Sequence, residues 1–157
     1  MWTSDYFGND GYPIPAFYFK VIFVNPLNGA DTSFQSVSGL SSEVKYKEIQ
    51  EGGGNEGSYS LPETVTHSPL VLKRGISSVN SGLFLWLNAV MQTDFRFPVY
   101  PRMLQIHLLD PQGWPNKVWQ IDDALPKKWS VDEFNSTGDK VAIETVELKY
   151  TKSSRLF

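Results

Sequence analysis

The 157-residue sequence contains no cysteine, which excludes disulfide bonds, thiolate nucleophiles and cysteine metal ligands. It contains only two histidines, His67 and His107, whereas a catalytic zinc site uses three protein ligands. Both fall in stretches that we expect to be strands, and we interpret them as ordinary strand residues. We therefore predict no metal site and no cofactor.

The sequence also lacks a strong charge of either sign and a long apolar run. Fourteen basic and seventeen acidic residues leave a net charge of -3, which argues against nucleic-acid binding. The longest apolar run, LFLWL at 83–87, is far shorter than a membrane span. The N-terminus has no basic or apolar segment typical of a signal peptide, so we expect synthesis in the cytoplasm without one.

Catalytic motifs are missing as well. The stretches at 39–43 and 57–61 each fail the G-x-S-x-G pattern because neither ends in glycine. The carboxylates at 122–123 and 132–133 are sequence neighbours, which point to opposite faces of a strand and do not form an acid–base pair. We predict that the protein is not an enzyme and that it has no catalytic residue.

One motif resembles a phosphate-binding loop. Gly52, Gly54 and Gly57 match G-x-G-x-x-G, which binds a pyrophosphate only where a helix follows the loop. Here Pro62 and the β-branched residues 64–66 follow, and both disfavour a helix. We therefore reject a nucleotide site and interpret the glycines as a turn.

Aromatic residues are abundant, at 14% of the chain, and 12 glycines and 10 prolines interrupt the sequence often. This composition favours strands joined by turns. We predict a mainly β fold, an antiparallel β-sandwich or barrel of about seven strands with one flanking α-helix. Residues 1–15 are expected to form an N-terminal arm, and 16–157 a single domain. The expected strands are 17–24, 34–40, 43–49, 65–73, 103–109, 117–122 and 140–150.

Alternation of apolar residues predicts which side chains of these strands point inward. The predicted inward sets are Phe17, Phe19, Val21 and Phe23; Leu70 and Leu72; Leu104, Ile106 and Leu108; and Val146, Leu148 and Tyr150.

The segments between the strands are expected to be turns and one longer connector. Residues 123–140 are expected to be a connector with a possible short helical turn, and 25–31 and 110–113 are expected to be turns.

The one expected helix covers 81–92. Leu83, Trp86, Leu87 and Val90 form an apolar stripe at helical spacing, and Asn80 or Ser81 is a suitable N-cap.

The segment 43–49 has a different pattern. Glu43, Lys45 and Lys47 alternate with Val44 and Tyr46, which predicts a strand with one solvated face and one packed face.

The order of these segments resembles the tail tube protein family of contractile phages, and most closely the inner tube proteins of extracellular contractile injection systems. The resemblance covers residues from about 12 to 150. Its most specific phrases are F-x-S-V-S-G-L at 34–40, L-K-R-G at 72–75 ahead of the helix with Trp86, and W-Q-I-D-D-A-L-P at 119–126. The extended N-terminus at 1–11 and the L-P-E-T stretch depart from the family pattern.

The resemblance implies a structural subunit of homo-hexameric rings that stack into a hollow tube inside a contractile sheath. The implied partners are other copies of the chain, sheath and baseplate proteins, and a cargo protein or DNA in the lumen, with no direct small-molecule ligand. The segment after the S-G-L phrase would be an arm that contacts neighbouring subunits. Carried over residue by residue, this arm comprises Glu43, Val44, Lys45, Tyr46, Lys47, Glu48, Gly52, Gly53 and Gly54.

Several alternatives stay open at this point. The chain fits either the main tube or a specialised ring that initiates the tube at the baseplate, and the particle is a phage tail, a tailocin or an injection system. In a different class of function, a monomeric carbohydrate-binding β-sandwich would use Trp114, Trp119 and Trp129 to stack on sugars.

Overall fold

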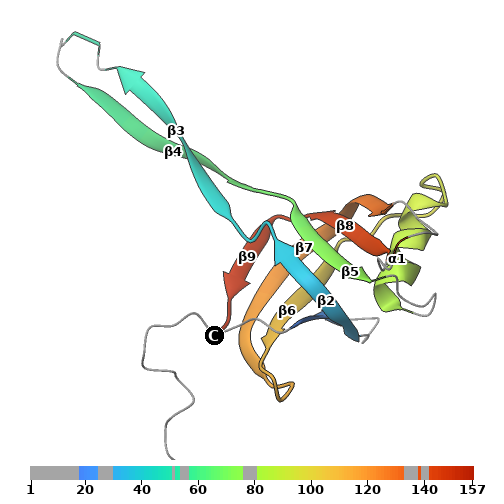
Figure 1. Cartoon of the computed structure of the whole chain (residues 1–157). Helices are drawn as coiled ribbons and strands as arrows, with labels where there is room; N and C mark the ends of the chain where they lie inside the picture. Colours follow the sequence, from blue (N-terminus) through green and yellow to red (C-terminus); the bar gives the residue numbers. More distant parts are fainter. Residues whose placement is uncertain are drawn as a thin grey trace, which may run out of the picture.

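The structure is a computed structural model that describes residues 18–24, 30–50, 52–53, 57–75, 81–132, 138 and 142–157. Nine strands and one helix lie in these residues (Figure 1). In chain order they are β1 (Tyr18–Val24), β2 (Ala30–Ser38), β3 (Ser42–Gln50), β4 (Ser58–His67), β5 (Leu70–Gly75), α1 (Gly82–Met91), β6 (Arg102–Leu109), β7 (Pro115–Val131), β8 (Ile143–Lys149) and β9 (Lys152–Arg155).

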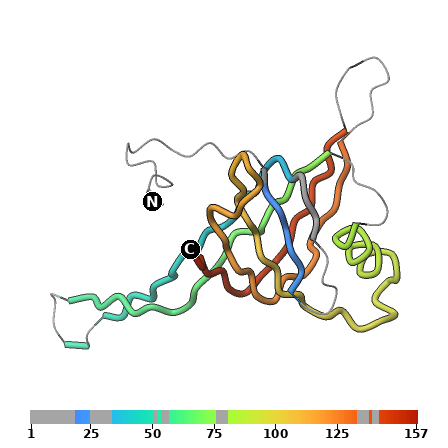
Figure 2. The backbone as a smooth tube through the Cα atoms, turned by 90° about the horizontal axis from the view of Figure 1, so that it is seen from below, coloured from blue at the N-terminus to red at the C-terminus, as the bar shows by residue number. Residues whose placement is uncertain are grey.

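Seven of the strands form one antiparallel sheet in the order β6-β1-β2-β5-β8-β7-β9, and a further pairing between β6 and β7 closes this sheet on itself. The long strand β7 makes the closure possible because its first half pairs with β6 and β9 and its second half pairs with β8. Asp123, at the change of partner, has a left-handed φ of 53°. We call the closed sheet together with α1 the body (Figure 2).

The core lies inside the closed sheet and continues under α1. Most of the predicted inward residues are fully buried there, which confirms the alternation. Phe19 is partly buried against this core, and Phe17 lies outside the described residues. The confirmed buried residues are Val21, Phe23, Leu70, Leu72, Leu104, Ile106, Val146, Leu148 and Tyr150.

One inward prediction was wrong. Leu109 is buried at 5% exposure, whereas Leu108 is only partly buried. The register between β6 and β7 shifts between these two residues, and such a bulge moves the following side chain to the other face.

The helix begins and ends close to the prediction. The Ser81 hydroxyl accepts a hydrogen bond from the Phe84 backbone N–H at 3.1 Å, which confirms Ser81 as the N-cap. Leu83, Trp86 and Leu87 are buried, and Val90 packs against the core. The helix thus covers one side of the sheet through the predicted stripe.

Two of the predicted strands need correction. The expected strand 65–73 is two strands, β4 and β5, separated by Ser68 and Pro69, and β4 begins seven residues earlier, at Ser58. The strand expected at 117–122 continues to Val131, so the first half of the predicted connector, 123–131, is strand instead. Strand β9 was not predicted. The turn expected at 25–31 lies largely outside the described residues, although residues 30 and 31 belong to β2.

The turn at 110–113 is confirmed. The backbone N–H of Gly113 donates to the carbonyl oxygen of Asp110 at 3.0 Å. The carboxylate of Asp110 also accepts from the N–H groups of Gln112 and Trp114.

The body as a whole is the predicted mainly β fold, a closed antiparallel sheet with one flanking helix. Among the described residues, no helix has the length and apolar character needed to cross a membrane.

Candidate functional site

Strands β3 and β4 form a separate two-stranded sheet that extends away from the body (Figure 1). We call these two strands and the turn residues 52–53 the arm. The arm continues the antiparallel pair of β2 and β5 outward, because β3 follows β2 and β4 precedes β5. Its nine-residue strand β3 gives it a length of roughly 30 Å.

The predicted contact residues lie on the arm. Glu43, Val44, Lys45, Tyr46, Lys47 and Glu48 all belong to β3, and all are exposed. Gly52 and Gly53 form the turn at the tip, where Gly53 has a φ of 111° that favours glycine, and Gly54 lies outside the described residues.

The prediction that one face of 43–49 is packed was wrong for the isolated chain, because all nine residues of β3 are exposed. The partner strand β4 is also exposed along its first eight residues. The arm thus has no covered face within its own chain. The sequence does predict the mixture of charged and apolar side chains, but it does not reveal that no other element covers the apolar ones.

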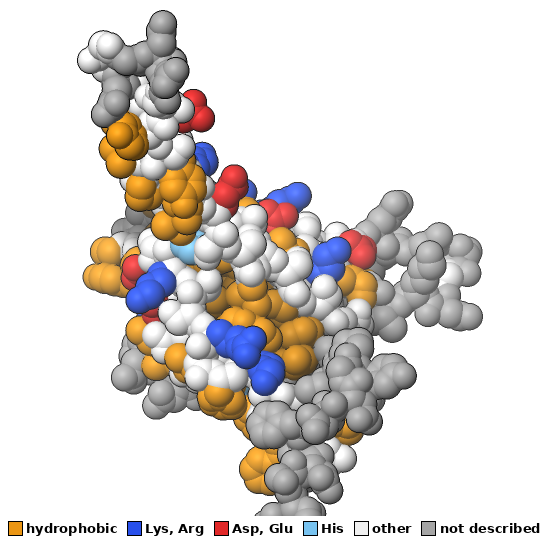
Figure 3. Space-filling model, turned by 90° about the vertical axis from the view of Figure 1, so that its left-hand side faces the viewer, with side chains coloured by type: hydrophobic (Ala, Val, Ile, Leu, Met, Phe, Trp, Pro, Cys, Tyr) orange, Lys and Arg blue, Asp and Glu red, His pale blue; other side chains and the backbone are white. Residues whose placement is uncertain are grey.

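The apolar side chains of the arm form two groups. Near the body, Val44 is paired with Val65, and Tyr46 lies on the same face. Near the tip, Ile49 is paired with Tyr59, and Leu61 lies on the face of Tyr59. Figure 3 shows hydrophobic side chains gathered along the arm, with acidic and basic side chains beside them. Their exposed fractions are Val44 43%, Tyr46 60%, Ile49 43%, Tyr59 57%, Leu61 50% and Val65 53%.

The joint between arm and body is tightly packed. A Cβ atom on Gly39, whose φ is 87°, would lie 1.8 Å from the carbonyl oxygen of Pro69. The Tyr150 hydroxyl donates to the carbonyl oxygen of Gly39 at 2.7 Å, and the Tyr150 ring lies 4.9 Å from the ring of His67. The Nδ1 atom of His67 is 3.1 Å from Ser42 Oγ. These contacts fix the direction in which the arm leaves the body, and the sequence did not reveal them.

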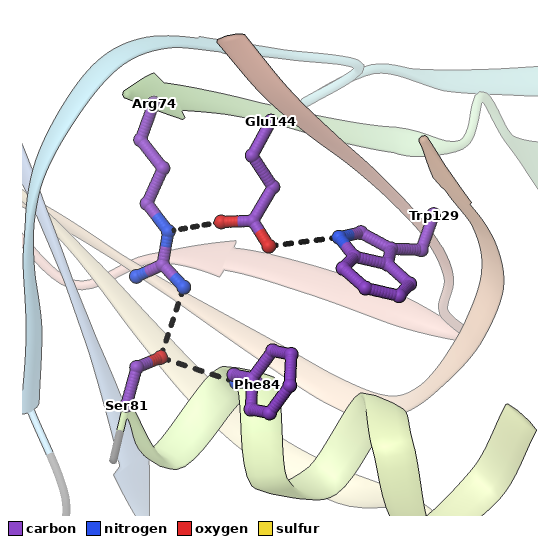
Figure 4. A network of polar contacts seen from close by, with 5 residues as sticks. All are labelled: Arg74, Ser81, Phe84, Trp129 and Glu144. Atoms are coloured by element: carbon purple, nitrogen blue, oxygen red, sulfur yellow. Dashed lines mark hydrogen bonds and ion pairs between the residues drawn. The ribbon is translucent and has the colours of Figure 1, made fainter. Parts of the chain in front are cut away.

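A buried ion pair holds α1 against the sheet (Figure 4). The Nε of Arg74 donates to Glu144 at 2.8 Å, and both side chains are at most 4% exposed. The second carboxylate oxygen of Glu144 accepts from Trp129 Nε1 at 2.7 Å. Arg74 also donates to the capping hydroxyl of Ser81 at 2.9 Å. The network thus connects β5, β7 and β8 to the helix N-terminus.

The two histidines lie on different strands, β4 and β6. His67 lies at the joint, and His107 lies on β6 opposite Lys20 of β1. Burial of the ring, followed by the positive charge of Lys20, lowers the pKa of His107 below its ordinary value. In the part of the chain that the structure describes, no three His, Asp or Glu side chains gather to hold a metal ion.

The three tryptophans proposed as a sugar platform have different surroundings. Trp119 and Trp129 pack against the core, and Phe84 lies edge-on to Trp129 at 5.8 Å. Only Trp114 is largely exposed, at 71%. The body's own packing therefore occupies two of the three rings.

Comparison with solved structures identifies similar chains in contractile particles. A chain of the anti-feeding prophage baseplate is 29% identical, with 92% of this chain and 96% of that chain covered and a TM-score of 0.73. A chain of the PVC sheath–tube complex, an extracellular contractile injection system, is 24% identical, with 93% of each covered and a TM-score of 0.71. A chain of the PVC sheath/tube terminator is 24% identical, with 93% and 98% covered and a TM-score of 0.72.

Comparison with curated protein sequences gives no match. The sequence profile of the family described as T4-like virus tail tube protein gp19 matches residues 15–154, which is most of the chain. The resemblance inferred from the order of the sequence phrases is thereby confirmed. The chain belongs to the T4-like virus tail tube protein family.

Proposed function

We propose that the chain is a ring subunit of the inner tube of a contractile phage-tail-like injection particle. Six copies close each ring, and the rings stack into a hollow tube through which a cargo protein or DNA passes. Membership of the tail tube family and the likeness to chains of contractile particles support this function.

The observation that carries the proposal is the exposure of the arm. A two-stranded ribbon is marginally stable by itself in water, and this one leaves six large apolar side chains at least 43% exposed. Such a ribbon gains stability when another chain covers it. Head-to-tail contacts between identical subunits close a ring when the rotation permits. The residues that make this contact are those of β3 and the glycine turn, from Glu43 to Gly54.

The charged residues of the arm serve a second purpose in this proposal. Glu43, Lys45, Lys47 and Glu48 are exposed along β3. Charge pairs between subunits fix the register and the choice of partner more than they raise affinity.

The partners of the assembled tube are sheath and baseplate proteins. The similar chains come from a sheath–tube complex, a tube-terminating cap and a baseplate. A specialised ring at the baseplate end of the tube is a second candidate, because a chain of a baseplate is 29% identical to this one. Both candidates require the same ring contact and differ in what lies above and below the ring.

The test is electron microscopy of the purified protein. We expect rings roughly 80–100 Å across, from six domains with a radius of gyration of about 13–15 Å each, or tubes of that width. Replacing Tyr46 with Asp should abolish rings and tubes while the monomer stays folded. The matched control is Trp114→Asp, an exposed aromatic of the body, which should still assemble. A wild-type protein that stays monomeric at all concentrations would refute the proposal.

The glycine turn offers a milder variant. Replacing residues 52–54 with alanine should impair assembly, because Gly53 has a left-handed φ of 111° that disfavours other residues. A Cβ on Gly52 or Gly53 meets nothing within 4 Å, and the turn lies at the tip of the arm, so the strain should stay in the arm and the body should remain folded. Normal tubes from this variant would mean that the tip geometry is unimportant for the contact.

A further inference from the structure

A hollow of about 280 Å³ lies where the end of α1 meets the segment that leads to β6. Trp86, Ala89 and Val90 line it from the helix, and Phe97, Tyr100 and Arg102 line it from the following segment. Its size is at the lower end of the range of ligand pockets. A hollow of this size accommodates one or two large side chains of another protein segment.

The segment beside this hollow presents aromatic side chains to solvent. Phe95, Phe97 and Tyr100 are 77%, 69% and 65% exposed, and Leu85 of α1 is 55% exposed. Asp94 and Phe95 also have left-handed φ angles of 48° and 58°, a strained conformation for a bulky residue. Core packing does not explain this strain, because the Phe95 ring lies outside the core. Strain of this kind is frequent at binding sites.

Arg102, which lines the hollow, carries an unsatisfied donor. Its Nε atom is buried and has no hydrogen-bond partner among the residues that the structure describes. A buried donor without an acceptor is destabilising, so a partner that brings an acceptor to the guanidinium gains affinity. The site calls for an apolar group that carries an oxygen, and tyrosine combines the two.

The tip group of the arm has this chemistry. Ile49, Tyr59 and Leu61 share one face of the ribbon, and all three are at least 43% exposed. The Tyr59 ring supplies apolar area, and its hydroxyl oxygen is able to accept from the guanidinium of Arg102. The carboxylates of Glu48 and Glu63 lie on the same two strands, and Arg96 lies beside the hollow's aromatic residues.

The arm and the hollow lie on opposite sides of the molecule. In Figures 1 and 2 the arm leaves one side of the body and α1 with its following segment lies on the other side. The strands of the arm pair only with each other. An arm therefore cannot reach the hollow of its own chain. Two different, matching surfaces on opposite sides of one subunit are what a head-to-tail contact requires.

We infer that the tip of the arm, through Ile49, Tyr59 and Leu61, seats in the hollow formed by α1 and residues 97–102 of a neighbouring copy. This inference rests on the proposed function, since it names the surface that receives the arm in the assembled tube.

The absence of cysteine from the chain makes a direct test possible, because two introduced cysteines are the only thiols present. Tyr59→Cys and Phe97→Cys are prepared as separate variants, mixed, assembled at a protein concentration raised to offset the weakened contact, and treated with a short bismaleimide. We expect a covalent dimer that contains one copy of each variant. The chain carrying both substitutions should give a ladder of dimers and larger species. The control pair, Tyr59→Cys with Trp114→Cys, should give no such product above background.

The outcomes separate the inference from the proposed function. Tubes that form without a link between positions 59 and 97 overturn the inference and leave the tube function standing, with the hollow open to a different protein. A wild-type chain that forms neither rings nor tubes overturns both. A link that forms equally well with position 114 means that the contact is unspecific, which also overturns the inference.

The donor provides a second measurement. Arg102→Met keeps the length and apolar stem of the side chain but removes the guanidinium. Loss of a hydrogen bond from a charged group to Tyr59 should raise the protein concentration needed for assembly by roughly tenfold or more. Tyr59→Phe should have a similar effect, and the two substitutions together should cost no more than either one alone. Additive effects would show that Tyr59 and Arg102 do not meet.

Discussion

The body and the arm are both built from antiparallel strands, but they differ in where their stability originates. In the body, strands such as β5 and β8 alternate fully buried residues with half-exposed ones. In the arm, every residue of β3 is exposed, including valine, tyrosine and isoleucine. The same residue types therefore have a covered environment in one region and none in the other.

This difference indicates that the body folds as a self-sufficient unit, whereas in the proposed tube the arm depends on contacts with another copy of the chain. The closed sheet leaves few of its backbone groups at a free edge. The arm has two free edges and two exposed faces. Substitutions in the body should therefore change the stability of the monomer, and equivalent substitutions in the arm should change assembly instead.

The largest effect is expected from Glu144→Ala in the body. The substitution leaves the buried Arg74 without its carboxylate and the Trp129 N–H without its acceptor. Breaking a buried ion pair in this way typically costs about 3–5 kcal/mol of unfolding free energy. Denaturant unfolding of the unassembled protein measures the loss. The matched control, Glu48→Ala on the exposed arm, should change it by less than about 0.5 kcal/mol. Similar losses from both variants would contradict the comparison.

The next largest effect separates apolar residues of the two regions. Leu72→Ala removes a fully buried side chain of β5 and should cost about 2–5 kcal/mol of unfolding free energy. Leu61→Ala, on the arm with 50% exposure, should cost less than about 0.5 kcal/mol. In an assembly assay, by contrast, Leu61→Ala should have a clear effect, since the Leu61 side chain would be covered by a neighbouring copy in the assembled tube. A stable monomer with normal tubes from Leu61→Ala would mean that this residue makes no contact.

A smaller effect is expected at the joint between the two regions. Gly39→Ala places a Cβ against the Pro69 carbonyl and forces a side chain into a left-handed conformation, so the backbone must move. The expected loss of unfolding free energy is about 1–3 kcal/mol. Because the arm must tilt to relieve the clash, tube formation should fail even where the body remains folded. Gly52→Ala, whose Cβ would meet nothing, is the matched control. Normal tubes from Gly39→Ala would show that the direction of the arm is not fixed at this joint.

Much of the body could be predicted from the sequence because burial there imposes a regular pattern. Val21 and Phe23, or Leu70 and Leu72, alternate with less buried residues, and the helix has its capping Ser81. The errors arose where a local signal conflicts with long-range pairing. Pro126 and the polar residues around it suggest a connector, but β7 continues through a register shift beside Pro126 because β8 pairs with it.

Less of the candidate site could be predicted. The alternation of Val44 and Tyr46 with charged residues predicts a strand, but the same pattern suits a covered face and an exposed one. Strand β4 has no clear alternation, and Pro62 within it is typical of an edge. The hollow beside α1 brings Trp86 together with Tyr100 and Arg102 through the turn after the helix, and no periodicity in the sequence predicts that approach.

The smallest effect is expected at His107 of the body. Its ring is only partly buried, so its environment is intermediate between the buried core residues and the exposed arm residues. Burial, followed by the charge of Lys20, lowers its pKa in the folded state below the ordinary value of about 6.5. The unfolded chain then binds more protons, so unfolding free energy is retained above pH ~6.5 and falls as the pH drops through the folded pKa. His107→Gln should remove this part of the pH dependence, and Lys20→Met should reduce it by removing the second cause. Denaturant unfolding between about pH 5 and 7 measures both, and an unchanged pH dependence in His107→Gln would assign the slope to other groups of the body.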